Sequence, residues 1–570
     1  MTGNRAVLLA LLVLFASAAR AAAEDSGAGP SGAQEFVEGE TPEYSDIIIQ
    51  KLTGLVMVDN PDAVVKGGLV GIKGVQNKGV PLLDDPAFKA RMSKFLNKPL
   101  TMAGRTEILN EVVYYFREHG RPFVDVSLMP QDVTYGVLQI LVLQAKVGGV
   151  RVMGGKWFSP DSMAKQVQAK PGEILDAKAI AQDLDWLNRN PFRQVDLVYV
   201  KGDEFGQANL LLRETDRFPL TAYLGYDDSG TKVTQNDRLS TGVNWGNAFG
   251  GDRQIDYNFL TSPDFQSFRA HSASFTQPLP WRHLLTFFGS YADIRADLPA
   301  PFNLGGFNWQ TSARYEIPLP ATADLKESVT AGFDYKKSNN NLTFGGLSVF
   351  ATATEIEQWS LGYTGQLKDS WGSTSLRATG FYSSGGLTSR NNDASFQESR
   401  AGSRSNYLYG KVELNRSTKL PYDFMLVNLL TLQYSDANLL ASEQLGFGGY
   451  DTVRGYDTRV YNSDSGLIAT MELRSPSMRA LSSFSDVSWL SGLGDLCQAL
   501  VFVDYGIGAN HLRLPGEAAE IQLWSAGPGV RYSISRYLTV RADYGWQLLN
   551  QAEAARPYAS RAHLSAIVRY

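Results

Sequence analysis

Residues 216–570 alternate apolar and polar side chains with a period of two. Near the C-terminus, for example, Val540 and Ala542 fall on one face of a strand, and Arg541 and Asp543 fall on the other. Successive side chains of a β-strand point to opposite faces, so each strand here has one apolar and one polar or charged face. Charged groups opposite an unbroken apolar face are typical of a membrane barrel with lipid outside and water in its lumen.

Sixteen segments of this kind can be counted, and they predict a mainly β fold with a 16-stranded antiparallel transmembrane β-barrel. The predicted strands lie near 218–227, 236–247, 251–260, 266–278, 281–294, 304–317, 324–338, 355–367, 371–384, 402–414, 424–435, 466–474, 498–506, 527–535, 537–546 and 562–570. Connections after even strands are mostly short, as periplasmic turns are, and connections after odd strands are longer, as extracellular loops are. The connection 475–496 is long for a periplasmic turn, so the pattern defines the neighbouring strand ends poorly.

Ahead of the barrel, the pattern changes to two small α+β domains, expected at 45–147 and 148–215. Each has the order strand, helix, helix, strand, strand. In the first domain we expect strands at 52–58, 123–128 and 136–143, an additional strand at 69–75 inside an insertion, and helices at 85–96 and 102–119. In the second domain we expect strands at 150–153, 195–200 and 208–212, and helices at 159–169 and 177–190.

The N-terminal segment is typical of an exported protein. Arg5 precedes a short apolar run at 6–16, and small residues follow, so residues 1–23 are predicted to be a secretory signal peptide. Residues 24–44 are acidic and rich in glycine, serine and proline, which predicts a disordered linker without a convincing amphipathic helix.

Composition narrows the class of protein further. No segment after the signal peptide reaches the ~18–20 continuous apolar residues of a membrane helix, so a membrane-spanning chain must cross as a closed sheet. A net charge of −5 gives no electrostatic case for binding nucleic acid. The single cysteine, Cys497, excludes an internal disulfide, and the five histidines form no zinc-protease motif. We therefore expect no enzyme, no catalytic residue, no metal site and no cofactor.

Two short motifs interrupt the regular pattern. The first is a glycine-rich stretch with the sequence Val453, Arg454, Gly455, Tyr456, and the second lies on a strand that places Phe502, Asp504 and Gly506 on one face. If the apolar face of that strand meets lipid, the carboxylate points into the lumen and needs a partner. Residue chemistry alone leaves two readings open: the cation is carried into the lumen to pair with the carboxylate, or the loop is exposed and water solvates the carboxylate.

The paired motifs resemble the signature of the polypeptide-transport-associated (POTRA) barrel superfamily of the outer membrane. Two POTRA domains before sixteen strands are similar to the haemolysin secretion/activation type, the transporter of two-partner secretion systems. The resemblance implies that the loop folds into the lumen, over about 436–465, and that Arg454 meets Asp504. It also implies an outer-membrane pore of a Gram-negative bacterium that recognises one exported partner at its periplasmic POTRA domains and translocates it unfolded.

The resemblance also suggests partners for the remaining residues. The exported partner is expected to be large and repeat-rich, and the barrel face is expected to contact outer-membrane lipid. The terminal aromatic Tyr570 resembles the signal read by the barrel-assembly machinery. Inward charges at Glu472, Arg474, Arg541 and Asp543 are interpreted as a charged lumen wall rather than as acid–base groups. Two alternatives remain: an insertase of the same superfamily, working at the seam between the first and last strands, and a passive porin.

Overall fold

The computed structural model describes residues 46–121, 123–204, 206–296, 302–344, 347–481, 494–549 and 559–570. The predicted signal peptide, 1–23, and the predicted linker, 24–44, lie outside these residues. The chain divides into two compact units, Met1–Gln144 and Ala145–Tyr570. No helix in the described part of the chain is long and apolar enough to cross a membrane.

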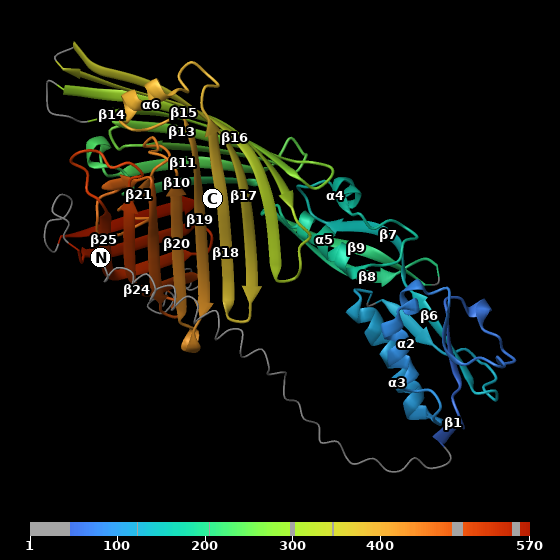
Figure 1. The fold of residues 1–570 in the computed structure, drawn as a ribbon. Helices are drawn as coiled ribbons and strands as arrows, with labels where there is room; N and C mark the ends of the chain where they lie inside the picture. The colour runs from blue at the N-terminus through green and yellow to red at the C-terminus, as the bar shows by residue number, and fades with distance from the viewer. Residues whose placement is uncertain are drawn as a thin grey trace. The chain divides into compact units, whose positions relative to one another are not determined.

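The second unit contains a closed barrel of sixteen antiparallel strands, which confirms the predicted fold class (Figure 1). The strands are β10 (Leu220–Asp227), β11 (Arg238–Ala248), β12 (Arg253–Thr261), β13 (Phe268–Pro278), β14 (Leu284–Ala296), β15 (Phe302–Pro318), β16 (Leu325–Phe344), β17 (Leu347–Asp369), β18 (Gly372–Ser384), β19 (Asn406–Lys419), β20 (Met425–Ser435), β23 (Ser465–Arg474), β24 (Asp495–Ala509), β25 (Ile521–Ile534), β26 (Leu538–Gln547) and β27 (Ser560–Arg569). The first strand pairs with the last, from Tyr223 opposite Arg569 to Asp227 opposite Ser565, and this pairing closes the barrel.

The two barrel faces differ as the alternation predicts. Outward side chains are apolar and exposed, such as Leu361, 64% exposed, and Val501, 56% exposed. Inward side chains are polar or charged and many are buried, such as Asp504 and Asp543. The lumen is therefore not an open water-filled tube over this part of the wall, because buried charges need protein groups around them.

Every predicted strand overlaps an observed one, but several ends were wrong. The hairpin of β16 and β17 continues to Phe344 and Leu347, well past the predicted ends at 338 and 355. The asparagines at 339–341 look like a loop in the sequence, yet the cross-strand backbone ladder continues through them. Alternation marks the part of a strand that faces lipid, whereas beyond that band both faces can be polar and the signal is lost.

The first unit is an α+β domain with a four-stranded sheet in the order β3-β2-β6-β5. Its elements are β2 (Gly54–Val58), β3 (Gly74–Lys78), α2 (Pro86–Ser93), α3 (Met102–Glu118), β5 (Val124–Ser127) and β6 (Val137–Gln144). The helices cover the sheet through a core that includes Leu55, Phe88, Val112, Phe116 and Ile140. The strand expected at 69–75 was misplaced: β3 begins at Gly74 and pairs in parallel with β2. A small sheet of β1 (Ile47–Ile49) and β4 (Leu100–Thr101) was not predicted, because such short strands carry no pattern.

The second unit begins with an α+β domain whose sheet has the order β7-β9-β8. Its elements are β7 (Lys146–Gly154), α4 (Pro160–Gln166), α5 (Ala177–Leu187), β8 (Arg193–Lys201) and β9 (Gln207–Asp216). Asp176 caps α5 by accepting from the backbone N–H groups of Lys178 and Ala179, and Leu187 lies in the core. This domain has the strand, helix, helix, strand, strand order expected for a POTRA domain.

Candidate functional site

The connection between β20 and β23 folds into the barrel. Its neck is a short hairpin of β21 (Leu445–Phe447) and β22 (Tyr461–Ser463). Beyond the neck, Gly448 and Gly449 have φ angles of 91° and 106°, and these left-handed conformations turn the chain toward the wall. The side chains of Val453, Arg454 and Tyr456 at the tip are all buried. We refer to residues 436–464 as the lumen loop.

The guanidinium of Arg454 lies against Asp504 of β24. Its Nε and Nη2 donate to the two oxygens of that carboxylate, each at 2.8 Å, and its backbone N–H donates to one of them at 3.0 Å. The same guanidinium stacks over the ring of Phe502, with its carbon 3.5 Å from the ring centroid. A planar, always-charged group suits this arrangement because its fork matches a carboxylate and its face matches an aromatic ring.

Two further carboxylates complete the surroundings of Arg454. Its Nη1 donates to Glu472 at 2.7 Å and lies 3.5 Å from Asp543. Glu472 also accepts from Arg474 and Arg531, and Asp543 accepts from Arg531 and Arg541. Opposite charges thus alternate through this cluster, which is how several buried ions can share a site that would be costly for any one of them alone.

Small residues on the wall let the tip approach. A Cβ added at Gly506 would lie 2.9 Å from Phe447 and 3.0 Å from Val453, so a side chain there would push the loop away. Phe447, Val453 and Tyr456 pack with Ile468 and Leu523 in an apolar cluster. Residue 506 is therefore glycine because the backbone of β24 comes so close to the loop that a side chain has no room.

The tip also contacts the strands that close the barrel. The backbone N–H of Gly455 donates to Nε2 of His563 on β27, at 3.1 Å. An imidazole nitrogen that accepts carries no proton, so Nδ1 holds the proton and donates to Asp228, at 2.7 Å, beyond the end of β10. The side-chain amide of Gln547 donates to the carbonyl of Gly455 at 2.7 Å. The loop tip is thus bonded to β26 and β27, and through His563 it is linked to Asp228 at the end of the first strand.

The structure brings most of the predicted site residues together in this cluster. Glu472, Arg474, Arg541 and Asp543, expected as a separate charged wall, lie directly around Arg454 or its partners. Tyr570 lies apart from them, 87% exposed, with its backbone N–H donating to Ala222.

Sequence reasoning missed several residues, among them Arg531 and His563. Arg531 stands directly opposite Arg541 in the register of β25 and β26. Two cations facing each other are unfavourable unless anions lie between them, so correct strand pairing would have pointed to the cluster. His563 had no such signal, because its partners come from the loop and from the far end of the barrel sequence.

The second α+β domain is joined to the barrel by the segment between α5 and β8. Asn190 donates to the carbonyl of Gly246 at 2.6 Å and to Asp252 at 2.7 Å, and Arg193 donates to Asp252 at 2.9 Å. The ring of Phe192 occupies the place that a side chain at residue 246 would need. These contacts hold the domain to the first periplasmic turn of the barrel.

Comparisons with known proteins agree with this architecture. Residues 206–532 match the family described as haemolysin secretion/activation protein ShlB/FhaC/HecB. The outer membrane transporter CdiB of Dickeya dadantii (strain 3937) is 23% identical over 520 residues, covering 88% of this chain and 87% of the relative. The heme/hemopexin transporter protein HuxB of Haemophilus influenzae (strain 86-028NP) is 21% identical over 490 residues, covering 81% of each chain.

A solved structure has a similar fold. CdiB from Escherichia coli superposes with a TM-score of 0.73 at 17% identity, covering 100% of this chain and 99% of that one. The family model, the relatives and the closed barrel confirm the resemblance inferred from the motifs, together with the outer-membrane location. The chain belongs to the haemolysin secretion/activation family of outer-membrane transporters, ShlB/FhaC/HecB.

Proposed function

We propose that this transporter receives one exported partner protein at its periplasmic POTRA domains and passes it, unfolded, through the barrel lumen. The observation that carries the proposal is the lumen loop, which is attached to the wall by Arg454 through contacts that can be broken without opening the barrel. A loop held by side-chain ion pairs is a removable closure, whereas the backbone ladder around it is not.

The two alternative functions, a passive porin and an insertase, explain this arrangement less well. A passive porin needs no periplasmic domain docked to its turns. An insertase would work by opening the seam between β10 and β27, and side chains hold that seam beyond the backbone ladder. Asp228 accepts from His563 and from the backbone N–H of Leu564, and it pairs with Arg561, all on the last strand. Transport through the lumen does not require any of these contacts to break.

The periplasmic domains are proposed to bind the partner as an added strand. The outer edge of β8 pairs with no other strand in the described part of the chain, and an extended peptide can hydrogen-bond to such an edge. The partner is proposed to be large and repeat-rich, and its folding outside the cell would favour outward movement. The transporter is proposed to have no catalytic activity, because its clustered charges neutralise one another. Tyr570 is proposed to be read by the barrel-assembly machinery during insertion.

The test is secretion by a variant that lacks residues 148–213. The barrel ladder does not include this segment, so the variant is expected to insert and to keep heat-modifiable migration on gels, while secretion of the partner falls to background. Secretion at the level of the intact protein would show that the domain is only a spacer, and failure of the barrel to insert would show that it is needed for assembly instead.

A further inference from the structure

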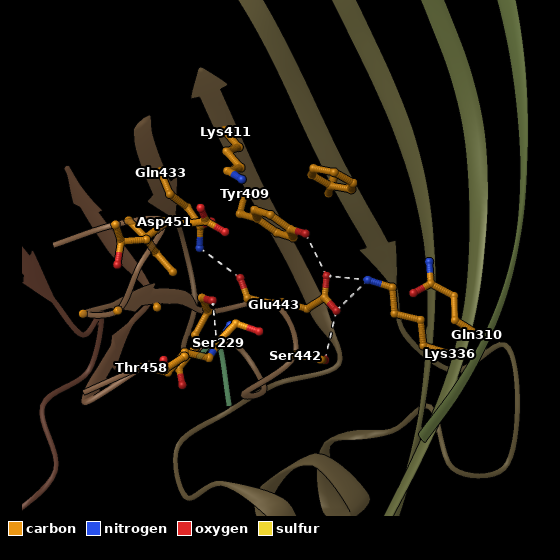
Figure 2. A pocket seen from close by; sticks show the side chains of 18 of the residues that line it. Ser229, Gln310, Lys336, Tyr409, Lys411, Gln433, Ser442, Glu443, Asp451 and Thr458 are labelled. Carbon is orange, nitrogen blue, oxygen red and sulfur yellow. Dashed lines mark hydrogen bonds and ion pairs between the residues drawn. The ribbon is translucent and has the colours of Figure 1, made fainter. Parts of the chain in front are cut away.

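The lumen loop is attached to the wall at a second place, far along its sequence from the tip. Glu443 lies two residues before the neck of the loop, and its side chain is almost completely buried, at 1% exposed. Figure 2 shows Lys336 and Tyr409 converging on its carboxylate from the wall. None of the groups around Arg454 takes part in this contact, so it is a separate site.

The contacts at Glu443 come from a different part of the wall. Lys336 of β16 donates to the two carboxylate oxygens at 2.8 and 3.0 Å, and Tyr409 of β19 donates at 2.7 Å. Gln358 of β17 donates through its side-chain amide at 3.1 Å, and Gln433 of β20 donates to the backbone carbonyl at 3.0 Å. The acids that bind Arg454 lie instead on β23, β24 and β26.

A tight turn of the backbone separates the two attachments. Gly448 and Gly449 lie between them, both with positive φ. Each glycine is also close to the ascending limb of the loop: a Cβ at Gly449 would lie 3.0 Å from Thr458. The two attachments therefore lie on opposite sides of a turn that glycine adopts readily and other residues do not.

Space is present beside Glu443. A cavity of about 560 Å³ is lined by wall residues such as Gln310, Lys336 and Lys411 and by loop residues such as Ser442, Asp451 and Thr458 (Figure 2). A limb released from Lys336 therefore has room within the lumen.

We propose that Glu443 is a second positioning residue for transport, which anchors the neck of the lumen loop to Lys336, Tyr409 and Gln358 independently of Arg454. The Glu443 site is thus one of several attachments of the loop to the wall, alongside Arg454 at the tip and the pair of Asp464 with Arg400. Loss of the Glu443 contact loosens residues 441–447, while Asn438 stays bonded to Leu512 and the tip stays attached to β24. The attachment itself does not require an exported partner protein. Only its importance for secretion rests on the proposed function.

Planar-bilayer recordings of the full-length protein test the anchor without any partner. Glu443→Gln keeps the size of the side chain and removes its charge, and Lys336→Met removes the matching cation. Each is expected to raise the ratio of open to closed time by about tenfold, the effect of losing ~1.4 kcal/mol from a charge-assisted contact. Because both variants break one contact, the double variant should open little more than either single variant. The proposal would be overturned if the increases in the open-to-closed ratio multiplied in the double variant. It would also be overturned if both single variants gave recordings like those of the wild type.

The matched control is Glu413→Gln. Glu413 is a glutamate of β19 whose ion pairs are with Lys411 and Arg377, both on the wall. It should leave the open-to-closed ratio unchanged, and an equal rise there would mean that any lost lumen charge loosens the loop.

Spin-label distances then test the independence of the two anchors. In a Cys497→Ser background, one label is placed at Ala441, near Glu443, or at Asp451, near Arg454, and the second at the lipid-facing Leu361. Glu443→Gln is expected to broaden the distance distribution from residue 441 and to leave the one from residue 451 unchanged. Broadening at both positions would mean that the loop moves as one body, and broadening at neither would mean that Glu443 is not an anchor. These distances do not depend on secretion. If they change as expected but the intact transporter exports no partner through its lumen, the proposed function is wrong and the anchor at Glu443 still stands.

Discussion

Arg454 in the lumen loop and Asp504 on β24 are joined by two parallel hydrogen bonds of 2.8 Å each, with both side chains buried. The residues are 50 positions apart in the chain. This pair does not belong to the barrel's backbone ladder, so it can part while all sixteen strands stay in register. In our account the pair holds the loop in the closed position, and its geometry determines how well the pore can be closed and reopened.

Removing either partner should release the tip and cripple secretion. Each of Arg454→Ala and Asp504→Ala leaves the charge of the other residue without its partner. This costs ~3–5 kcal/mol of stability where the site is fully buried and less where water enters. Both should still give heat-modifiable, membrane-inserted barrel, and secretion measured in the culture medium should fall to a small fraction of wild type. The double variant should be little worse than either single one.

The substitution Arg454→Lys separates charge from shape. An ammonium keeps the positive charge but cannot donate two parallel hydrogen bonds or stack over Phe502 as a plane. Secretion should therefore recover only in part relative to Arg454→Ala. Full recovery would mean that charge alone holds the loop, and full addition of the two single alanine defects would mean that Arg454 and Asp504 are not partners.

The loop also depends on a wall glycine. Gly506→Val should displace Phe447 and Val453, because even a Cβ at this position lies within 3.0 Å of both side chains. We expect channel openings like those of Arg454→Ala in planar bilayers, with the barrel intact. The control is Gly380→Val on β18, where an added Cβ meets nothing within 4 Å. If the two valine variants behave alike, the effect comes from valine in a strand and not from the loop.

A pH effect is expected in the second POTRA domain. Burial, with repulsion from Asp216 and Asp252, raises the pKa of the Glu214 carboxyl from 4.5 to about 7. Neither of its oxygens has a hydrogen-bond partner among the described residues. The folded domain thus keeps a proton that the unfolded chain releases at lower pH. The stability that depends on this proton is fully present below about pH 4.5 and is lost as the pH rises through about 7.

Hydrogen exchange of the full-length protein, corrected for intrinsic rates, measures this effect. Amides of β7 and β9 should be better protected at about pH 5 than at about pH 8. Glu214→Gln stays uncharged and should lose most of that difference. If the variant keeps the wild-type pH dependence, another group is responsible.

The barrel could be predicted strand by strand because its signal is local. Each lipid-facing strand carries its own alternation, so a segment such as 537–546 can be recognised without knowing its neighbours. Strand ends were less accurate, as the long hairpin of β16 and β17 shows, because alternation stops where lipid stops. The strand β3 was misplaced for a related reason: it is an edge strand whose parallel pairing with β2 leaves no period in the sequence.

The candidate site could be predicted only where a family resemblance supplied it. The resemblance placed Arg454 beside Asp504, and the structure has them in contact. The roles of Glu472 and Asp543 as further partners were not visible, since each alternates normally within its own strand. Glu443 and His563 contact groups from segments far away in sequence. Such contacts depend on how the loop crosses the lumen, and no periodicity encodes that path.

The most direct test of the account is to find where the partner chain lies during export. A photoreactive residue is placed at Lys411, which faces the lumen on β19, or at Leu408, on the outward face of the same strand and 54% exposed. The partner is stalled by fusing a tightly folded domain to its C-terminus, and the cells are illuminated. Passage through the lumen should give a covalent adduct between transporter and partner from position 411 and none from position 408. Adducts from 408 alone, or from neither position while the stalled partner is exposed outside the cell, would contradict passage through this lumen.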